Sequence, residues 1–240
     1  MSSKETHIIF GLHSSLSAIT NKNRSIKKII LTEEVLGKNK KIFESITNIE
    51  KKILNRKQID SLTGVKIHQG IVVYADSLPV KAISDIRNEE DLVIILDSLN
   101  DPQNVGSIIR TAYAFGVKTI IYSKHNSFEI TPFLIKSASG AFEKINFIEV
   151  INLNRTVEKL KKMGYWIVGF DMNAKSNISE VPKDLKKVLI FGSEGKGIRP
   201  LILKNCDFKT KISLNVEDRK IDSLNVSNCV SIALYECLRK

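Results

Sequence analysis

The residues best suited to chemistry lie in three short segments of the second half of the chain. The segment DSLNDPQNVGSIIRTAYAFG carries Asn104 and Arg110, and LIFGSEGKGIR carries Glu194 within a glycine-rich loop. The third, IDSLNVSNCVSIALYE, carries Ser223 and Asn225 ahead of an amphipathic stretch. Because glycine has no Cβ, the backbone of such a loop can approach a ligand closely. We therefore predict that these segments form a cofactor-binding and catalytic site.

Each segment also has a purely structural interpretation. Asn104 follows Pro102 and could cap a helix with its side-chain oxygen, as could Ser223 in the third segment. The glycine loop could be a plain turn with Glu194 in solvent, since it fits neither the GxxxxGK[ST] nor the GxGxxG phosphate-binding pattern. Arg110 is harder to explain, because its apolar helix offers no carboxylate three or four residues away. We expect it to be half-buried and to bind an anion.

Apolar periodicity predicts an α/β protein with a small N-terminal module at 1–76, a linker at 77–90 that contains Pro79, and a larger module at 91–240. The larger module opens with the apolar run LVIIL, which is typical of a parallel strand buried on both faces. We expect a mostly parallel sheet with ligand loops at the carboxyl ends of its strands. The predicted strands are 26–32, 71–75, 92–96, 119–122, 147–151, 165–170 and 188–191. The predicted helices are 7–20 after a short turn, 33–47, 55–64, 104–116, 131–138, 154–163 and 224–238.

Composition narrows the class of protein. The chain has 240 residues and a formal net charge of +11, which favours a polyanionic partner such as nucleic acid, although a lysine-rich proteome would give the same balance. Residues 1–80 hold 13 Lys and Arg against 7 Asp and Glu, so the N-terminal module is the expected polyanion-binding part. No stretch reaches the roughly 18 apolar residues of a membrane span. The N-terminus does not read as a signal peptide.

The three cysteines indicate the compartment. Cys206, Cys229 and Cys237 are odd in number and form no CxxC pair. Such cysteines are typical of buried thiols in a reducing cytosol rather than of disulfides or zinc ligands. We expect a cytoplasmic protein without a metal site.

By their residues and their order along the chain, the three segments resemble the SpoU (TrmH/RlmB) branch of the SPOUT RNA 2′-O-methyltransferases, which use S-adenosyl-L-methionine. SASGAFEKI at 137–145 resembles a mid-domain segment of that family. FGLHS and HQGIVVYA near the N-terminus resemble the substrate-binding domain of its RlmB-like members, so the resemblance spans about residues 7 to 238. It implies a small N-terminal α/β substrate-binding domain and a C-terminal α/β domain with a deep trefoil knot, which periodicity does not indicate. It also implies a homodimer through the knotted domain.

The resemblance assigns site residues by position. It implies catalytic groups at Asn104, Arg110, Glu194, Ser223 and Asn225. It implies cofactor contacts at Gly192, Gly195, Ile212, Leu214 and Leu224. The implied reaction moves a methyl group from a sulfonium to a ribose 2′-OH, a poor nucleophile that needs in-line alignment and help with its proton. Because a guanidinium almost never deprotonates, we expect Arg110 to bind the 3′-side phosphate or the developing alkoxide. Glu194 and Asn104 would orient it, and Ser223 and Asn225 would fix the cofactor loop.

One segment departs from the family pattern. The family commonly shows Ile-Pro-Met-x-Gly before Ser-Leu-Asn, whereas this chain has Ile212-Ser213-Leu214 and a loop about three residues longer. For RNA contacts in the N-terminal module we expect basic and histidine residues: His13, Arg24, Lys27, Lys28 and His68. The leading functional hypothesis is guanosine 2′-O-methylation of large-subunit (23S) rRNA. The alternatives are 2′-O-methylation of tRNA and a non-catalytic ribosome-assembly factor that binds RNA.

Overall fold

The computed structural model describes residues 5–214 and 224–239. The chain forms two compact units. The N-terminal unit contains residues 1–79 together with 130–144, and the C-terminal unit contains 80–129 and 145–240. A segment from the middle of the chain therefore belongs to the N-terminal unit.

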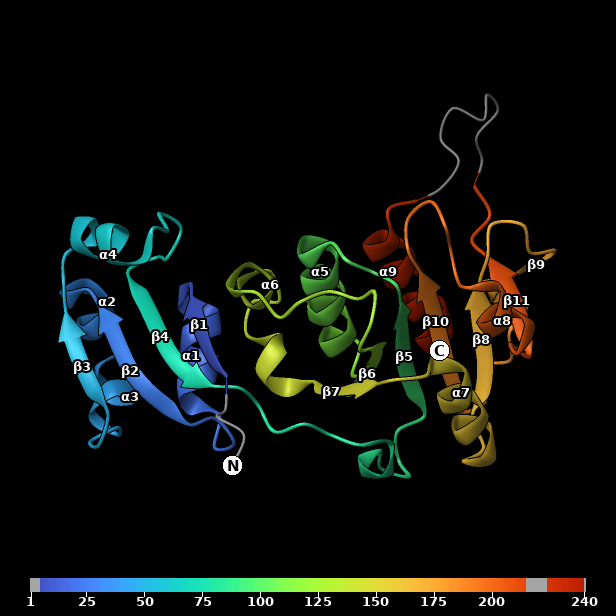
Figure 1. Cartoon of the computed structure of the whole chain (residues 1–240), viewed down its shortest axis with the longest axis horizontal. Helices are drawn as coiled ribbons and strands as arrows, with labels where there is room; N and C mark the ends of the chain where they lie inside the picture. Colours follow the sequence, from blue (N-terminus) through green and yellow to red (C-terminus); the bar gives the residue numbers. More distant parts are fainter. Residues whose placement is uncertain (1–4, 215–223, 240) are drawn as a thin grey trace. The chain divides into compact units, whose positions relative to one another are not determined.

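The N-terminal unit is built on a four-stranded sheet in the order β1-β4-β2-β3 (Figure 1). β1 pairs antiparallel with β4, β4 antiparallel with β2, and β2 parallel with β3. The strands are β1 (Thr6–Phe10), β2 (Ile26–Leu31), β3 (Glu50–Ile53) and β4 (Ile71–Asp76). The helices are α1 (Leu12–Thr20), α2 (Glu33–Lys38), α3 (Lys40–Glu44), α4 (Arg56–Thr63), α6 (Pro132–Ser137) and the 3-10 turn η2 (Ala141–Lys144).

Three local features of this unit differ from the expected elements, and the first is β3 (Glu50–Ile53), which is not among the predicted strands. Residues 7–20 contain a strand before the helix, because Gly11 has a φ of 92° and turns the chain from β1 into α1. The helix expected at 33–47 is divided at Asn39, whose φ of −124° is not helical. The helix at 55–64 is as predicted and ends at Gly64 with a φ of 67°, a left-handed cap that glycine adopts without a Cβ clash.

The C-terminal unit contains a seven-stranded sheet in the order β7-β6-β5-β10-β8-β11-β9, and every neighbouring pair is parallel. Its strands are β5 (Leu92–Asp97), β6 (Thr119–Ser123), β7 (Asn146–Val150), β8 (Trp166–Phe170), β9 (Ser176–Asn177), β10 (Lys187–Gly192) and β11 (Phe208–Lys211). Its helices are η1 (Ile83–Asp85), α5 (Pro102–Ala114), α7 (Leu153–Lys162), η3 (Ile178–Glu180), α8 (Pro200–Lys204) and α9 (Val226–Leu238). The expected α/β class with a mostly parallel sheet is confirmed.

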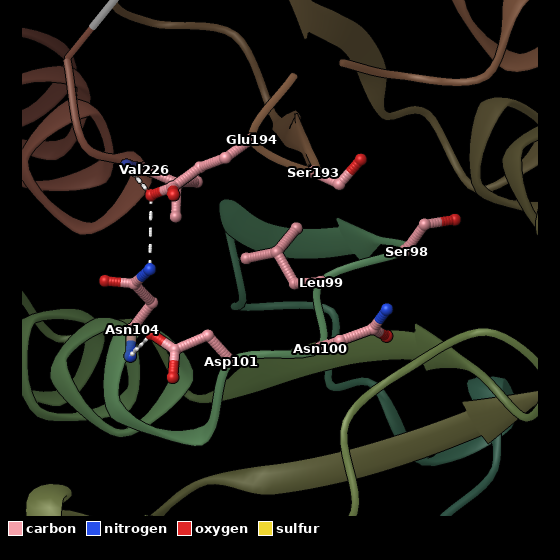
Figure 2. A pocket seen from close by; sticks show the side chains of 8 residues that line it. All are labelled: Ser98, Leu99, Asn100, Asp101, Asn104, Ser193, Glu194 and Val226. Carbon is pink, nitrogen blue, oxygen red and sulfur yellow. Dashed lines mark hydrogen bonds between the residues drawn. The ribbon is translucent and has the colours of Figure 1, made fainter. Parts of the chain in front are cut away.

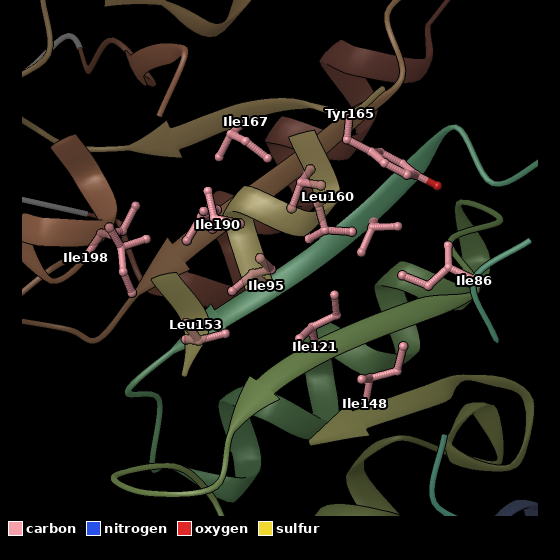
Figure 3. Packing of buried hydrophobic residues seen from close by; sticks show 14 residues of the cluster. Ile86, Ile95, Ile121, Ile148, Leu153, Leu160, Tyr165, Ile167, Ile190 and Ile198 are labelled. Atoms are coloured by element: carbon pink, nitrogen blue, oxygen red, sulfur yellow. The ribbon is translucent and has the colours of Figure 1, made fainter. Parts of the chain in front are cut away.

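The neighbouring strands β5 and β10 form the centre of the core of the C-terminal unit. Every residue of β5 is buried, and alternate positions such as Val93 and Ile95 pack with Val188 and Ile190 of β10 on the face that α7 covers (Figure 3). The intervening residues are equally buried, and α5 packs against α9. Strands buried on both faces read as continuous apolar runs, which is why these two were predictable from sequence.

The weakest strands were not predicted. β9 and β11 are short, and only Thr210 among their residues is buried, so they carry no apolar pattern. The pairing of Asp97 with Gly192 places the carboxyl ends of β5 and β10 next to each other, and the loops that follow leave the sheet at one edge. Over residues 5–214 and 224–239, the helices are too short or too polar to cross a membrane.

Candidate functional site

Glu194 is the centre of a hydrogen-bond cluster at this edge of the sheet. Its Oε1 accepts hydrogen bonds from Asn104 Nδ2 at 3.1 Å, Asn225 Nδ2 at 3.1 Å and the backbone N of Val226 at 3.3 Å. Asn225 Nδ2 also donates to Asn104 Oδ1 at 2.9 Å. Figure 2 shows Asn104, Glu194 and Val226 converging from α5, the loop after β10 and α9. The structure thus brings together three of the five residues expected to carry the chemistry.

Helix capping explains how Asn104 is free to join this cluster. The N-cap of α5 is Asp101, whose carboxylate accepts hydrogen bonds from Gln103 N at 3.2 Å and Asn104 N at 3.0 Å. The expectation that Asn104 is the cap is therefore wrong. Since Asp101 satisfies the first backbone donors and Pro102 lacks one, the Asn104 side chain is left to face Glu194.

Asn225 combines two roles. It is the N-cap of α9, where its Oδ1 accepts a hydrogen bond from Ser227 N at 2.9 Å. Its Nδ2 is turned to Glu194 and Asn104, so one amide both begins the helix and bridges the other two segments. Ser223, the other residue predicted in this segment, lies outside the described residues, as does the lengthened loop at 215–222.

The glycines fold the Glu194 loop back on itself. Gly197 N donates to Ser193 O at 2.9 Å, and Gly195 and Gly197 have φ angles of 87° and 66°. A Cβ at Gly192 would lie 2.0 Å from the backbone carbon of Gly197, so no other residue fits there without moving the loop. At Gly192 the close approach is made by the loop's own backbone, whereas the sequence argument assigned it to a ligand.

A buried carboxylate anchors the far end of the same loop. Asp97, the last residue of β5, is fully buried and accepts hydrogen bonds from Arg199 N and Arg199 Nε, both at 2.8 Å, and from Ser98 Oγ at 3.2 Å. Arg199 immediately precedes α8. Sequence reasoning did not select this pair, although a carboxylate directly after an unbroken apolar strand was the available signal. The pair fixes where the loop that carries Glu194 returns to the sheet.

A pocket of about 190 Å³ opens beside the cluster. Its lining combines amide, hydroxyl and carboxylate groups with two aliphatic side chains: Ser98, Leu99, Asn100, Asp101, Asn104, Ser193, Glu194 and Val226. Within the described residues, Glu194 Oε1 accepts three hydrogen bonds and Glu194 Oε2 accepts none. A hydroxyl or amine of a ligand in this pocket can therefore donate to a carboxylate whose orientation is already fixed.

Four of the five predicted cofactor contacts lie where parallel strands end. Gly192 ends β10 and Gly195 follows it, while Ile212 and Leu214 follow β11. Leu224 directly precedes the cap of α9 and is half-buried, and Leu214 is exposed. Backbone groups at strand ends together with aliphatic side chains suit the adenosine portion of a nucleoside cofactor, so the residues present fit this group.

The structure corrects the expectation for Arg110. Its side chain is exposed and not half-buried, and it forms no hydrogen bond or ion pair with the part of the chain that the structure describes. Arg110 lies six residues after Asn104 on α5, which on an α-helix is about 120° around the axis and about 9 Å along it. Within one chain, Arg110 is therefore not part of the Asn104–Glu194–Asn225 cluster.

Two of the residues predicted to contact RNA are interior residues. The side chain of Arg24 is fully buried and forms an ion pair with Glu143 Oε1 at 2.8 Å, and it also donates to the backbone O of Asp76 at 2.9 Å. His68 is buried with its Nε2 3.0 Å from Asp60 Oδ1. A buried charge must be paired and a buried polar ring needs a hydrogen-bond partner, and Glu143 and Asp60 provide these contacts. Arg24 and His68 therefore stabilise the N-terminal unit and do not face RNA.

The remaining three candidates are on the surface. Lys27 Nζ lies 2.6 Å from Asp76 Oδ1, and Lys28 Nζ lies 2.5 Å from Glu50 Oε1, so both ammonium groups already have a carboxylate partner. His13 is exposed on the first turn of α1. Among these three, His13 is the side chain most available to an RNA ligand.

The cysteines are free thiols and do not suggest a metal site. Burial raises the pKa of the Cys206 and Cys229 thiols to about 12, so they remain protonated at neutral pH. The part of the chain covered by the structure contains no cluster of three His, Cys, Asp or Glu residues placed to hold a metal ion.

Comparison with known proteins is consistent with both units. The model of the SpoU rRNA Methylase family matches residues 91–235, and the model described as RNA 2′-O ribose methyltransferase substrate binding matches residues 8–80. The resemblance that the three segments indicate is thereby confirmed.

Individual relatives match over nearly the whole chain. The 23S rRNA (guanosine-2′-O-)-methyltransferase RlmB of Coxiella burnetii is 33% identical over 97% of this chain and 95% of its own length. YacO of Bacillus subtilis, named as a TrmH family tRNA/rRNA methyltransferase, is 31% identical over 99% of this chain and 97% of its own. The structure of the SpoU methyltransferase AviRb from Streptomyces viridochromogenes, in complex with the cofactor AdoMet, has a TM-score of 0.82 at 20% identity, over 98% of this chain and 90% of that one. This last likeness is one of fold.

Proposed function

The chain belongs to the SpoU rRNA methylase family, and on that premise we propose that it transfers a methyl group from S-adenosyl-L-methionine to the ribose 2′-OH of a guanosine in large-subunit (23S) rRNA. The observation that carries the proposal is the Asn104–Glu194–Asn225 cluster beside a pocket at the carboxyl ends of β5 and β10. The choice of rRNA and guanosine is supported by the RlmB relative, which matches both units of this chain.

The cluster can orient the attacking hydroxyl. When bound, the cofactor supplies a methyl group activated by its positive sulfur. Glu194 Oε2 accepts a hydrogen bond from the 2′-OH, while Asn104 and Asn225 hold Oε1 and so fix the direction of that contact. Methyl transfer to this hydroxyl would require its proton to leave, and the fixed carboxylate of Glu194 would accept that proton or assist its loss.

Cofactor binding falls to the strand ends named above. Gly192, Gly195, Ile212, Leu214 and Leu224 would hold the nucleoside, and Ser223 would complete the loop ahead of α9. We also propose the expected trefoil knot for the C-terminal unit, where α9 contacts both α5 and β10. The three free cysteines support a cytoplasmic location.

We propose that the active form is a homodimer through the C-terminal unit. α5 and α9 pack against each other and leave large apolar side chains exposed, namely Tyr113, Phe115, Ile232, Tyr235 and Leu238. Arg110 is exposed on the same side of α5 as Tyr113, three residues away. In a dimer formed on this face, Arg110 would serve the site of the other copy, where it can bind the phosphate beside the target ribose.

The dimer proposal is tested by mixing two inactive variants. Arg110→Ala and Asn225→Ser would each be expressed alone, to show that each is inactive, and would also be coexpressed in one host so that hybrid dimers form. If Arg110 acts across the interface, hybrid dimers contain one intact site, and about a quarter of the wild-type activity should return for random pairing. If Arg110 acts within its own copy, no activity returns. Light scattering of Tyr235→Lys, which places a charge on the apolar face, should show a monomer.

The reaction is tested with labelled cofactor. The protein would be incubated with S-adenosyl-L-methionine carrying a labelled methyl group and with separated large-subunit rRNA and tRNA, and the 2′-O-methylated positions would be mapped. We expect label at a guanosine of the large-subunit rRNA. Label in tRNA alone would favour the tRNA alternative, for which the B. subtilis relative's name leaves room. Binding of rRNA with no label and no cofactor binding would favour the non-catalytic assembly factor.

A further inference from the structure

The segment 130–144 is firmly attached to the N-terminal unit, although it lies outside the region that matches the substrate-binding family. Ser14 and Ser17 of α1 donate hydrogen bonds to its backbone carbonyls at 3.1 and 3.0 Å. Its Glu143 forms the buried ion pair with Arg24. The surface of the N-terminal unit therefore includes side chains that sequence order assigns to the other module.

The most exposed aromatic side chain of this unit belongs to that segment. Phe133 on α6 is 54% exposed. Its ring meets the buried ring of Phe10 edge to face, with centroids 5.4 Å apart and an interplanar angle of 84°. This contact orients the Phe133 ring while leaving much of its surface in solvent.

The side chains of Gln69 and of Lys136 on α6 lie at the Gly11 turn, which directly follows Phe10. A Cβ at Gly11 would lie 3.3 Å from Lys136 Cγ and 3.2 Å from Gln69 Oε1, so both side chains lie against the turn. Gln69 Oε1 accepts a hydrogen bond from the backbone N of Leu12, the first residue of α1. The next residue, His13, is exposed. Lys136 forms no ion pair with any carboxylate in the described ranges.

This combination suits an unpaired nucleotide. Single-stranded RNA is recognised by stacking of its bases on aromatic side chains, with cations on the adjoining phosphates. Phe133 and Lys136 are three residues apart on α6 and so share one face. Lys27 and Lys28, by contrast, are already paired with carboxylates, and Arg24 and His68 are buried.

We propose that Phe133 stacks on an unpaired base of the substrate RNA, and that Lys136 and His13 bind the phosphates on either side of it. The inference rests on the proposed function, because it names a contact through which the RNA substrate is held. An exposed aromatic ring alone would equally suit a protein partner. The unpaired lysine beside it and the net charge of +11 favour RNA.

The test compares matched variants of the full-length protein. Phe133→Leu keeps apolar packing on Phe10 but removes the aromatic face, and Phe133→Tyr restores that face. Trp166→Leu is the control, because Trp166 is a 46% exposed aromatic of the C-terminal unit that also packs on another ring, Phe208, at 5.7 Å. Lys136→Gln is paired with Lys66→Gln, an exposed lysine of the N-terminal unit. The probes are a single-stranded RNA of about 20 nucleotides and the same sequence as a duplex.

We expect Phe133→Leu to weaken binding of the single strand by about 5- to 150-fold, the range that loss of one stacked base represents, with little change for the duplex. Phe133→Tyr and Trp166→Leu should bind like the wild type. Lys136→Gln should weaken binding and reduce its salt dependence more than Lys66→Gln does. In methyl transfer to total rRNA, Phe133→Leu should raise KM for RNA and leave kcat at saturating RNA and cofactor binding unchanged.

Several outcomes would overturn the inference while leaving the proposed function standing. One is normal RNA affinity and KM for Phe133→Leu in a protein that methylates rRNA. Another is a change in oligomeric state for Phe133→Leu with unchanged RNA binding, which would identify the ring as a contact between copies. If the wild-type protein neither binds RNA nor transfers methyl groups, the proposed function fails as well.

Discussion

At the scale of single residues, the candidate site depends on amide and carboxylate groups that each hold more than one partner. Glu194 Oε1 accepts from two side chains and one backbone amide, and Asn225 caps α9 while it bridges Glu194 and Asn104. A group with two roles can be dissected only by a substitution that keeps one of them. Asn225 permits such a substitution.

Asn225→Ser should separate capping from bridging. Serine is as good an N-cap as asparagine, so α9 and the melting temperature should be nearly unchanged. It has no amide to reach Glu194 and Asn104, and kcat/KM for methyl transfer should fall by about 100-fold or more, as for loss of one preorganised donor. Circular dichroism melts and single-turnover transfer rates measure the two effects. Full activity in this variant would show that the bridge is not required.

The contact between Asp97 and Arg199 should hold the Glu194 loop in place where it returns to the sheet. Arg199→Met removes the Nε donor and leaves a buried carboxylate with fewer partners, which should cost about 1–3 kcal/mol of unfolding free energy. Arg199→Lys should restore part of the stability but not the transfer rate, because an ammonium cannot reproduce the paired geometry of the guanidinium. Denaturant unfolding and kcat measurements distinguish these results. Equal kcat values for Arg199→Lys and the wild type would contradict a positioning role.

At the scale of elements, the loop between β10 and α8 is shaped by glycines that have different functions. Gly192 is required by close packing, because its Cβ would meet the backbone of Gly197 at 2.0 Å. Gly195 has open space around it, and its requirement comes from a φ of 87°. Substitution by alanine should therefore have different consequences at the two positions.

Gly192→Ala should displace the loop that holds Glu194, and both methyl transfer and cofactor binding should be largely lost. Gly195→Ala should cost only the strain of a left-handed alanine, about 1–2 kcal/mol, with measurable activity remaining. Isothermal titration with S-adenosyl-L-methionine and transfer assays on the same preparations provide the comparison. Similar losses for the two variants would show that close packing at Gly192 is not decisive.

At the scale of the whole molecule, each unit has its own buried polar contacts, and those of the N-terminal unit introduce a pH dependence. His7 is buried, and Arg24 Nη1 lies 3.4 Å from its Nδ1, so the neutral ring is the form that accepts this hydrogen bond. Burial, followed by the charge of Arg24, lowers the pKa of His7 below its usual value near 6.5, while Glu5 acts in the opposite direction. The unfolded chain therefore binds this proton more readily than the folded chain.

Stability should fall as the pH decreases below about 6.5, because protonation then favours the unfolded state. His7→Asn offers an acceptor oxygen near the position of Nδ1 and cannot be protonated, so its stability should decline less between pH 7 and pH 5. Urea unfolding of both proteins at several pH values gives the difference in slope that belongs to His7. Parallel curves for the two proteins would assign the pH dependence to other groups.

The sequence by itself determined the α/β class, the central strands and the family, because apolar runs and ordered motifs are local properties of the chain. It also identified Asn104, Glu194 and Asn225, although it assigned the helix cap to Asn104. Only the tertiary structure decided that Asp101 is that cap, that Arg110 is exposed and that Arg24 and His68 are interior. The groups that pair with the buried side chain of Arg24 belong to Asp76 and Glu143, which are far away in the sequence. Whether a side chain caps, pairs or faces solvent depends on such distant neighbours, and no local pattern records them.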